Sequence, residues 1–130
     1  MLFTFFLSVW HGGQSSEAKA AAEGLTEGSK EQIAADFLLS PASLVEKEAG
    51  FRRALSDKYA WFADYIVGEY HYKNGDRDKA LEAYQSCYKF IRELIQRGQP
   101  GIGNSFFVRQ LVARLRELGA SDKPEEETEN

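Results

Sequence analysis

The residue types that carry most protein chemistry are few in this chain, and their spacing matches no known catalytic or metal site. The two histidines are His11, in an apolar N-terminal segment, and His71, between two tyrosines. A structural zinc site needs about four ligands, mostly Cys and His, and the chain has one cysteine, Cys87. We therefore expect no metal site and no cofactor. A single cysteine also excludes an internal disulfide, and its place on a predicted buried helix face indicates packing.

Other catalytic groups are not indicated either. The serines fall at predicted turns and helix caps, without the histidine and carboxylate that would activate a nucleophile. The glycine-rich stretch 98–103 lies between two predicted helices and lacks the lysine and hydroxyl that hold a nucleotide and its magnesium ion. Glu46 with Glu48, or Asp57 with Asp64, could be imagined as an acid and base pair, but acidic residues on helices usually face solvent. We expect no enzymatic activity and no catalytic residue.

Helical periodicity accounts for the chain from residue 30 onward. Ser29 is placed to cap a first helix, with Gln32 as in a capping box, and Ser40-Pro41 ends it. Proline suits the first turn of the next helix, Asp76 is a good N-cap, and Gly119 stops the last helix. Helices are predicted over residues 30–39, 41–55, 58–73 and 76–97, followed by a fifth that Asn104 or Ser105 caps. No segment requires a strand.

The third and fourth predicted helices form a hairpin. Gly68 lies inside an apolar helical pattern, where glycine costs roughly 1 kcal/mol relative to alanine, so we expect a neighbouring helix to approach closely there. Asn74-Gly75-Asp76 supplies the turn, and Ala80 and Tyr84 share one face of the second helix.

This spacing resembles the tetratricopeptide repeat, in which Leu-Gly in the first helix is followed by Ala and Phe in the second. Val67-Gly68 matches the first pair, and Ala80 with Tyr84 matches the second. The copy is divergent, because Asp64 holds the Trp position, His71 holds the Tyr position and no proline closes the second helix. A decayed preceding repeat is indicated by Phe51 and Ala54, which lie 33 residues before Tyr84 and Cys87.

The resemblance implies an all-α fold over residues 30–119: antiparallel helical hairpins stacked as a short right-handed solenoid of about five helices. It comprises two repeats and a C-terminal capping helix. In that capping helix we expect the apolar side chains to face inward and the charged ones outward. The inward set is Phe107, Leu111, Leu115 and Leu118; the outward set is Arg109, Arg114, Arg116 and Glu117.

In the family that the chain resembles, the first helix of a hairpin lines a groove that takes an extended peptide or a partner helix. The groove positions correspond here to Phe62, Tyr65, Glu69 and Tyr72. The resemblance therefore implies a non-catalytic protein-interaction or assembly module with a protein or peptide partner. Three alternatives stay open: Phe62 and Tyr65 pack against the neighbouring hairpin, the protein is a structural subunit of a larger complex, or it is an enzyme with an unrecognised helical site.

Composition favours a small helical domain and argues against nucleic acid as a partner. The 130 residues are 43% hydrophobic and 28% charged, which is typical of globular domains. The net charge of −4 arises in the tail 120–130, which we expect to be disordered. The rest is balanced in charge and shows no basic stripe for binding phosphates.

The N-terminal segment 1–20 is interpreted separately. Leu2 to Trp10 is almost continuously apolar, and Ala18-Lys19-Ala20 resembles a signal-peptidase site, but no Lys or Arg precedes the apolar run. Three interpretations of the segment are open: it is a signal peptide, it is an apolar element that docks on the folded body, or the start codon has been assigned inside a longer protein. Residues 21–29 are predicted to be a linker. Export is expected in the first case and a cytoplasmic location otherwise, with membrane contact only if the apolar segment is retained.

Overall fold

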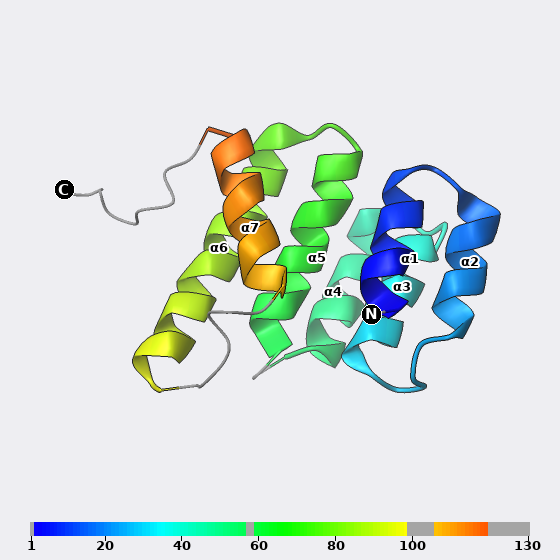
Figure 1. Ribbon diagram of the computed structural model, residues 1–130, viewed down its shortest axis with the longest axis horizontal. Helices are drawn as coiled ribbons and strands as arrows, with labels where there is room; N and C mark the ends of the chain where they lie inside the picture. Colours follow the sequence, from blue (N-terminus) through cyan, green and yellow to red (C-terminus); the bar gives the residue numbers. More distant parts are fainter. Residues whose placement is uncertain (1, 57–58, 99–105, 120–130) are drawn as a thin grey trace. The chain divides into compact units, whose positions relative to one another are not determined.

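The structure of the chain is a computed structural model, which describes residues 2–56, 59–98 and 106–119. These residues form seven helices and no strand, so the predicted all-α class is confirmed (Figure 1). The helices are α1 (Leu2–His11), α2 (Ser15–Glu23), α3 (Lys30–Leu39), α4 (Leu44–Ala54), α5 (Ala60–Lys73), α6 (Arg77–Gln96) and α7 (Phe106–Glu117). The five predicted helices correspond to α3–α7.

The two additional helices lie in the segments interpreted as a leader and a linker. Helices α1 and α2 pack against each other as a hairpin, with the turn made by Gly13 at a φ of 78°. Phe6 and Leu7 of α1 are buried, and so is Ala18 of α2, whereas Phe5 is 57% exposed. The N-terminal apolar run is thus an amphipathic helix with a partner. In the part of the chain that the structure describes, no helix combines the length and apolarity needed to cross a membrane.

The chain divides into two compact units, Met1–Tyr59 and Ala60–Asn130. The boundary falls inside the region predicted to form one helical domain. The first unit contains α1–α4 and the second contains α5–α7, and each is described by itself.

In the first unit, side chains cap both ends of α3. The Ser29 hydroxyl accepts a hydrogen bond from the Gln32 backbone N–H at 3.1 Å, as predicted. The Gln32 side chain reaches back to the N–H of Gly28 instead of Ser29. At the other end, the Lys47 ammonium donates to the carbonyl oxygens of Phe37 at 2.7 Å and Ser40 at 3.0 Å. Such a cation satisfies carbonyl groups that the end of a helix leaves unpaired.

Helix α4 begins three residues later than predicted. Ser43 supplies the cap: its hydroxyl accepts a hydrogen bond from the Glu46 N–H at 3.2 Å, and the helix starts at Leu44. The prediction that Pro41 opens this helix is therefore wrong. The Phe51 ring of α4 stacks on the Phe37 ring of α3 with centroids 4.1 Å apart, which joins the two helices.

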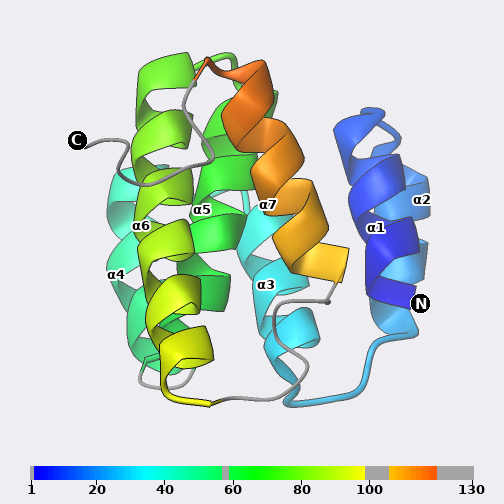
Figure 2. The ribbon, with the colours of Figure 1, turned by 60° about the vertical axis from the view of Figure 1, so that its left-hand side comes forward.

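In the second unit, α5 and α6 form the predicted hairpin (Figure 2). Gly75 makes the turn at a φ of 80°, and the Asp76 carboxylate accepts a hydrogen bond from the Lys79 N–H at 3.2 Å. A Cβ atom on Gly68 would lie 2.6 Å from the Tyr84 ring, so the close helix approach predicted at Gly68 is confirmed. Helix α7 lies along α5 and α6 in both views.

Three predictions concern residues that the structure does not describe. These are the glycine-rich connection from residue 99 to 103, the cap at Asn104 or Ser105, and the acidic tail 120–130.

Candidate functional site

The four residues predicted to line a groove lie on one face of α5, as their spacing of three and four residues requires. Phe62 is 0% exposed, Tyr65 and Glu69 are each 1% exposed, and Tyr72 is half-buried. Side chains of α7 contact the aromatic residues at one end of this face and Glu69 at the other. We call the face formed by Phe62, Tyr65, Glu69 and Tyr72 the acceptor face of α5.

Phe107 of α7 fills the aromatic end of the acceptor face. Its ring packs edge-on against the rings of Phe62 and Tyr65, with centroid distances of 5.3 Å and 5.5 Å. Trp61, which the sequence analysis did not include, lies beside the same ring at 6.0 Å. Aromatic pairs of this geometry each contribute roughly 0.5–1.5 kcal/mol beyond the burial of their area. This end therefore works as a socket for one aromatic side chain.

Glu69 forms the polar end, where it binds one side chain from α6 and one from α7. The Tyr84 hydroxyl donates a hydrogen bond to its Oε2 at 2.5 Å. The Arg114 guanidinium donates from Nε to Oε2 at 3.0 Å and from Nη2 to Oε1 at 3.3 Å. This is a two-pronged arginine–carboxylate pair, the geometry that gives such pairs both strength and orientation.

Tyr72 and Glu117 complete the surroundings of the arginine. The guanidinium carbon of Arg114 lies 4.0 Å from the centroid of the Tyr72 ring, within the range of a cation–π interaction. The Tyr72 hydroxyl donates a hydrogen bond to Glu117 of α7, whose carboxylate is also 3.7 Å from Arg114 Nη1. The guanidinium is therefore held by two carboxylates and one aromatic ring.

The surroundings of this cluster shift the pKa of its buried tyrosine and of its arginine. Burial, with the negative charge of Glu69, raises the pKa of the Tyr84 hydroxyl well above its usual range. Burial alone would lower the pKa of Arg114, but its hydrogen bonds and attraction to Glu69 raise it overall. The tyrosine thus stays neutral and the arginine stays charged at physiological pH. A neutral donor and a permanent cation therefore surround the Glu69 carboxylate.

Sequence reasoning placed Arg114 on the wrong side of its helix. It was predicted on the charged outer face of α7, yet its side chain is only 18% exposed and reaches Glu69. The signal was present: Arg114 follows Phe107 by seven residues and Leu111 by three, which places all three on one helical face. Leu111 and Leu115, predicted to face inward, are fully buried.

One buried polar atom near this cluster has no partner. Among the described residues, the Tyr65 hydroxyl is the one buried side-chain oxygen or nitrogen without a hydrogen bond. Cys87, by contrast, is fully enclosed, and burial raises the pKa of its thiol. The cysteine therefore fills space in the core, as predicted, and is not a reactive group.

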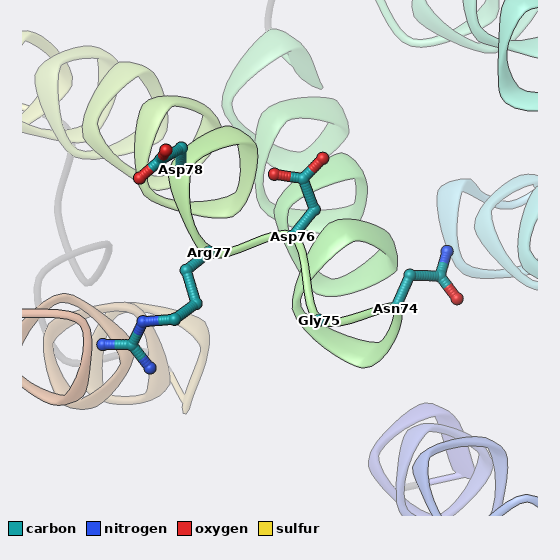
Figure 3. A pocket seen from close by; sticks show the side chains of 5 residues that line it. All are labelled: Asn74, Gly75, Asp76, Arg77 and Asp78. Atoms are coloured by element: carbon teal, nitrogen blue, oxygen red, sulfur yellow. The ribbon is translucent and has the colours of Figure 1, made fainter.

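An open hollow of about 560 Å³ lies at the turn between α5 and α6, lined by residues 74–78. Figure 3 shows that its side chains point in different directions and do not converge on a common centre. The Asp76 carboxylate is already used as a helix cap. In the described ranges there is also no cluster of three or more His, Cys, Asp or Glu side chains that could hold a metal ion. The cluster around Glu69 is therefore the stronger candidate site.

Comparison of the chain with known protein families, curated proteins and solved structures finds no match.

Proposed function

We propose that this protein is a non-catalytic protein-interaction module in which the acceptor face of α5 receives an amphipathic helix, with α7 as the internal occupant. The observation that carries the proposal is the contact of one helix with both ends of the face. Phe107 fills the aromatic socket and Arg114 pairs with Glu69. Binding of an amphipathic helix in a groove is a common mode of peptide recognition, with anchors spaced at helical intervals.

The proposal includes a tetratricopeptide-like arrangement, with α3–α4 and α5–α6 as two repeats of a short right-handed solenoid and α7 as the capping helix. In its favour, Phe51 and Tyr84, which are 33 residues apart, are both buried in the second helix of their hairpins. The following pair agrees less well, because Ala54 is exposed whereas Cys87 is buried. The first repeat therefore departs further from the pattern than the second.

In this proposal a partner helix competes with α7 for the acceptor face. A segment tethered to its own binding site has an effective concentration in the millimolar range, so an external helix binds weakly while α7 is docked. Loosening α7 removes this competition and raises the apparent affinity of the partner. The affinity for an external helix should therefore rise when the contacts of α7 with the acceptor face are weakened. If α7 instead took part in binding the partner, the same change would lower that affinity.

The experiment is a titration of a fluorescent peptide containing residues 106–119 with the full chain, followed by fluorescence anisotropy. Phe107→Ala in the full chain removes the aromatic anchor of α7 and leaves the acceptor face intact. We expect it to tighten peptide binding by roughly tenfold, because it removes two aromatic contacts of half-buried Phe107, each contributing roughly 0.5–1.5 kcal/mol. Ala113→Ser, at an exposed position of α7, is the control and should change nothing.

Helical content measured by circular dichroism shows whether each variant is folded. If the folded Phe107→Ala chain binds the peptide no better than the original chain, the acceptor face does not exchange its helix, and the proposal is wrong.

A further inference from the structure

The polar end of the acceptor face has the composition of a guanidinium pocket. Glu69 and Tyr72 come from α5 and Tyr84 from α6, so all three belong to the hairpin that receives the helix. Glu69 offers both carboxylate oxygens to Arg114, and the Tyr72 ring lies 4.0 Å from the guanidinium carbon. The Tyr84 hydroxyl donates to the Oε2 atom of the same carboxylate and helps to orient it. A pocket built in this way is matched to one side-chain type.

We infer that the acceptor face selects partner helices that carry an arginine seven residues after an aromatic residue, with leucine four residues after the aromatic. The inference rests on the proposed function and specifies its ligand. The pattern is that of Phe107, Leu111 and Arg114 in α7, the helix that the face already holds. Seven residues span about 10.5 Å along a helix, which sets the separation between the aromatic socket and the guanidinium pocket.

Lysine does not replace arginine in this pocket. The guanidinium makes two hydrogen bonds to Glu69 in a planar fork and lies over the Tyr72 ring. An ammonium group is a compact, strongly hydrated charge that cannot reproduce the fork. A helix with lysine at this position should therefore bind about tenfold more weakly than one with arginine, and a helix with a neutral residue more weakly still.

Burial makes the discrimination strong. Glu69 is 1% exposed, so a helix without a cation removes a positive charge and two hydrogen bonds from a carboxylate that water hardly reaches. A binding site with a buried polar group discriminates strongly against ligands that lack the matching polar group. An apolar pocket discriminates much less against a ligand that lacks one methylene group. We expect a loss of about 100-fold or more when glutamine replaces the arginine of the ligand.

Four labelled peptides of residues 106–119 test the inference by anisotropy against the full chain carrying Phe107→Ala. They are the natural sequence, Arg114→Lys, Arg114→Gln, and a register variant in which Ala113→Arg and Arg114→Ala move the cation by one position. The natural peptide should bind tightest, and the register variant should be as weak as the glutamine peptide. The same series is measured on the full chain with both Phe107→Ala and Glu69→Gln, where the preference for arginine should fall to within about twofold.

The outcomes separate the inference from the proposed function. If all four peptides bind equally to the chain with Glu69, the face binds helices without reading arginine, and the inference is overturned while the proposed function stands. If none binds, the proposed function fails. Should Phe107→Ala unfold the chain, Val112→Ala at a half-buried position of α7 is a milder way to loosen that helix and allows the same comparison. If the Phe107→Ala chain forms dimers that Glu69→Gln abolishes, the acceptor face binds α7 of a second copy of the chain. That result overturns the idea of a separate partner.

Discussion

Two buried tyrosines beside Glu69 should respond in opposite ways to the loss of a hydroxyl group. Tyr84 donates a hydrogen bond of 2.5 Å to the Glu69 carboxylate. The Tyr65 hydroxyl is equally buried but has no hydrogen-bond partner. Tyrosine→phenylalanine at each position removes one oxygen and keeps the ring, so packing and cavity effects are small. The pair therefore isolates the energy of one hydroxyl with a partner and one without.

The expected magnitudes follow from general hydrogen-bond energetics. A hydrogen bond to a charged group contributes about 1.5–3 kcal/mol, and Arg114 still pairs with Glu69 when Tyr84 is changed, so Tyr84→Phe should cost about 2 kcal/mol. A buried polar group without a partner costs about 1–3 kcal/mol, so Tyr65→Phe should raise the free energy of unfolding by about 1 kcal/mol. The two variants should differ by about 3 kcal/mol.

Urea unfolding monitored by tryptophan fluorescence measures both values. Trp10→Phe leaves Trp61 of α5 as the single tryptophan, so the signal reports the unit that contains both tyrosines. With a slope of about 1.5 kcal/mol per molar urea, the midpoints of the two variants should lie about 2 M apart. A loss of stability in Tyr65→Phe would refute the reasoning, because it would mean that this hydroxyl has a favourable partner in solution.

Three further predictions concern the same unit and one matched position outside it. Gly68→Ala should lower the free energy of unfolding by about 1–3 kcal/mol, since the added Cβ would meet the Tyr84 ring. Gly50→Ala in α4 is the matched control: its added Cβ would meet open space, so the change should raise the free energy of unfolding by up to about 1 kcal/mol. Thermal unfolding of the two variants compares these effects. Arg114→Met should cost about 3 kcal/mol by removing the ion pair with the buried Glu69 carboxylate, and adding Glu69→Gln should restore part of the loss in a double-mutant cycle. The pKa of Tyr84 is raised in the folded state above its unfolded value of 10.0, so its contribution is complete below pH 10 and is lost above it by about 1.4 kcal/mol per pH unit. Tyr84→Phe should make the slope of stability against pH shallower by this amount, whereas Tyr65, whose pKa is also raised, keeps its own share.

The α5–α6 hairpin could be predicted from the sequence because its signals are local. A glycine at the turn and an aspartate cap fix the break, and the predicted bounds of both helices fall within two residues of the observed ones. Gly68 was informative for the same reason, since glycine inside a helix needs a local cause. By contrast, the start of α4 was misplaced because Pro41 and Ser43 are both acceptable helix starts, and only the structure shows which one is used.

The helical hairpin α1–α2 was harder to predict. A short apolar run followed by small residues is a feature of export signals, and the same pattern suits an amphipathic helix packed against an alanine-rich one. Composition does not separate the two interpretations, because burial of Phe6 and Ala18 depends on a partner helix rather than on either segment alone. Arg114 posed a related problem: arginine is usually exposed, and its buried position follows from Glu69, 45 residues earlier in the chain.

The pairing of Arg114 with Glu69 also fixes the register of α7. Apolar contacts alone tolerate a slip of one turn, because leucines recur along the inner face of α7 at intervals of three and four residues. Such a slip would carry the guanidinium about 5.4 Å away and break both of its hydrogen bonds to the buried Glu69 carboxylate. The aromatic socket sets where the helix begins on the acceptor face, and Glu69 rejects every alignment that does not bring a guanidinium to it. The aromatic socket and Glu69, which together give α7 one position, would impose the same alignment on a partner helix. Recognition by this face therefore depends on the spacing between an aromatic anchor and an arginine, and not on the total apolar area of the helix.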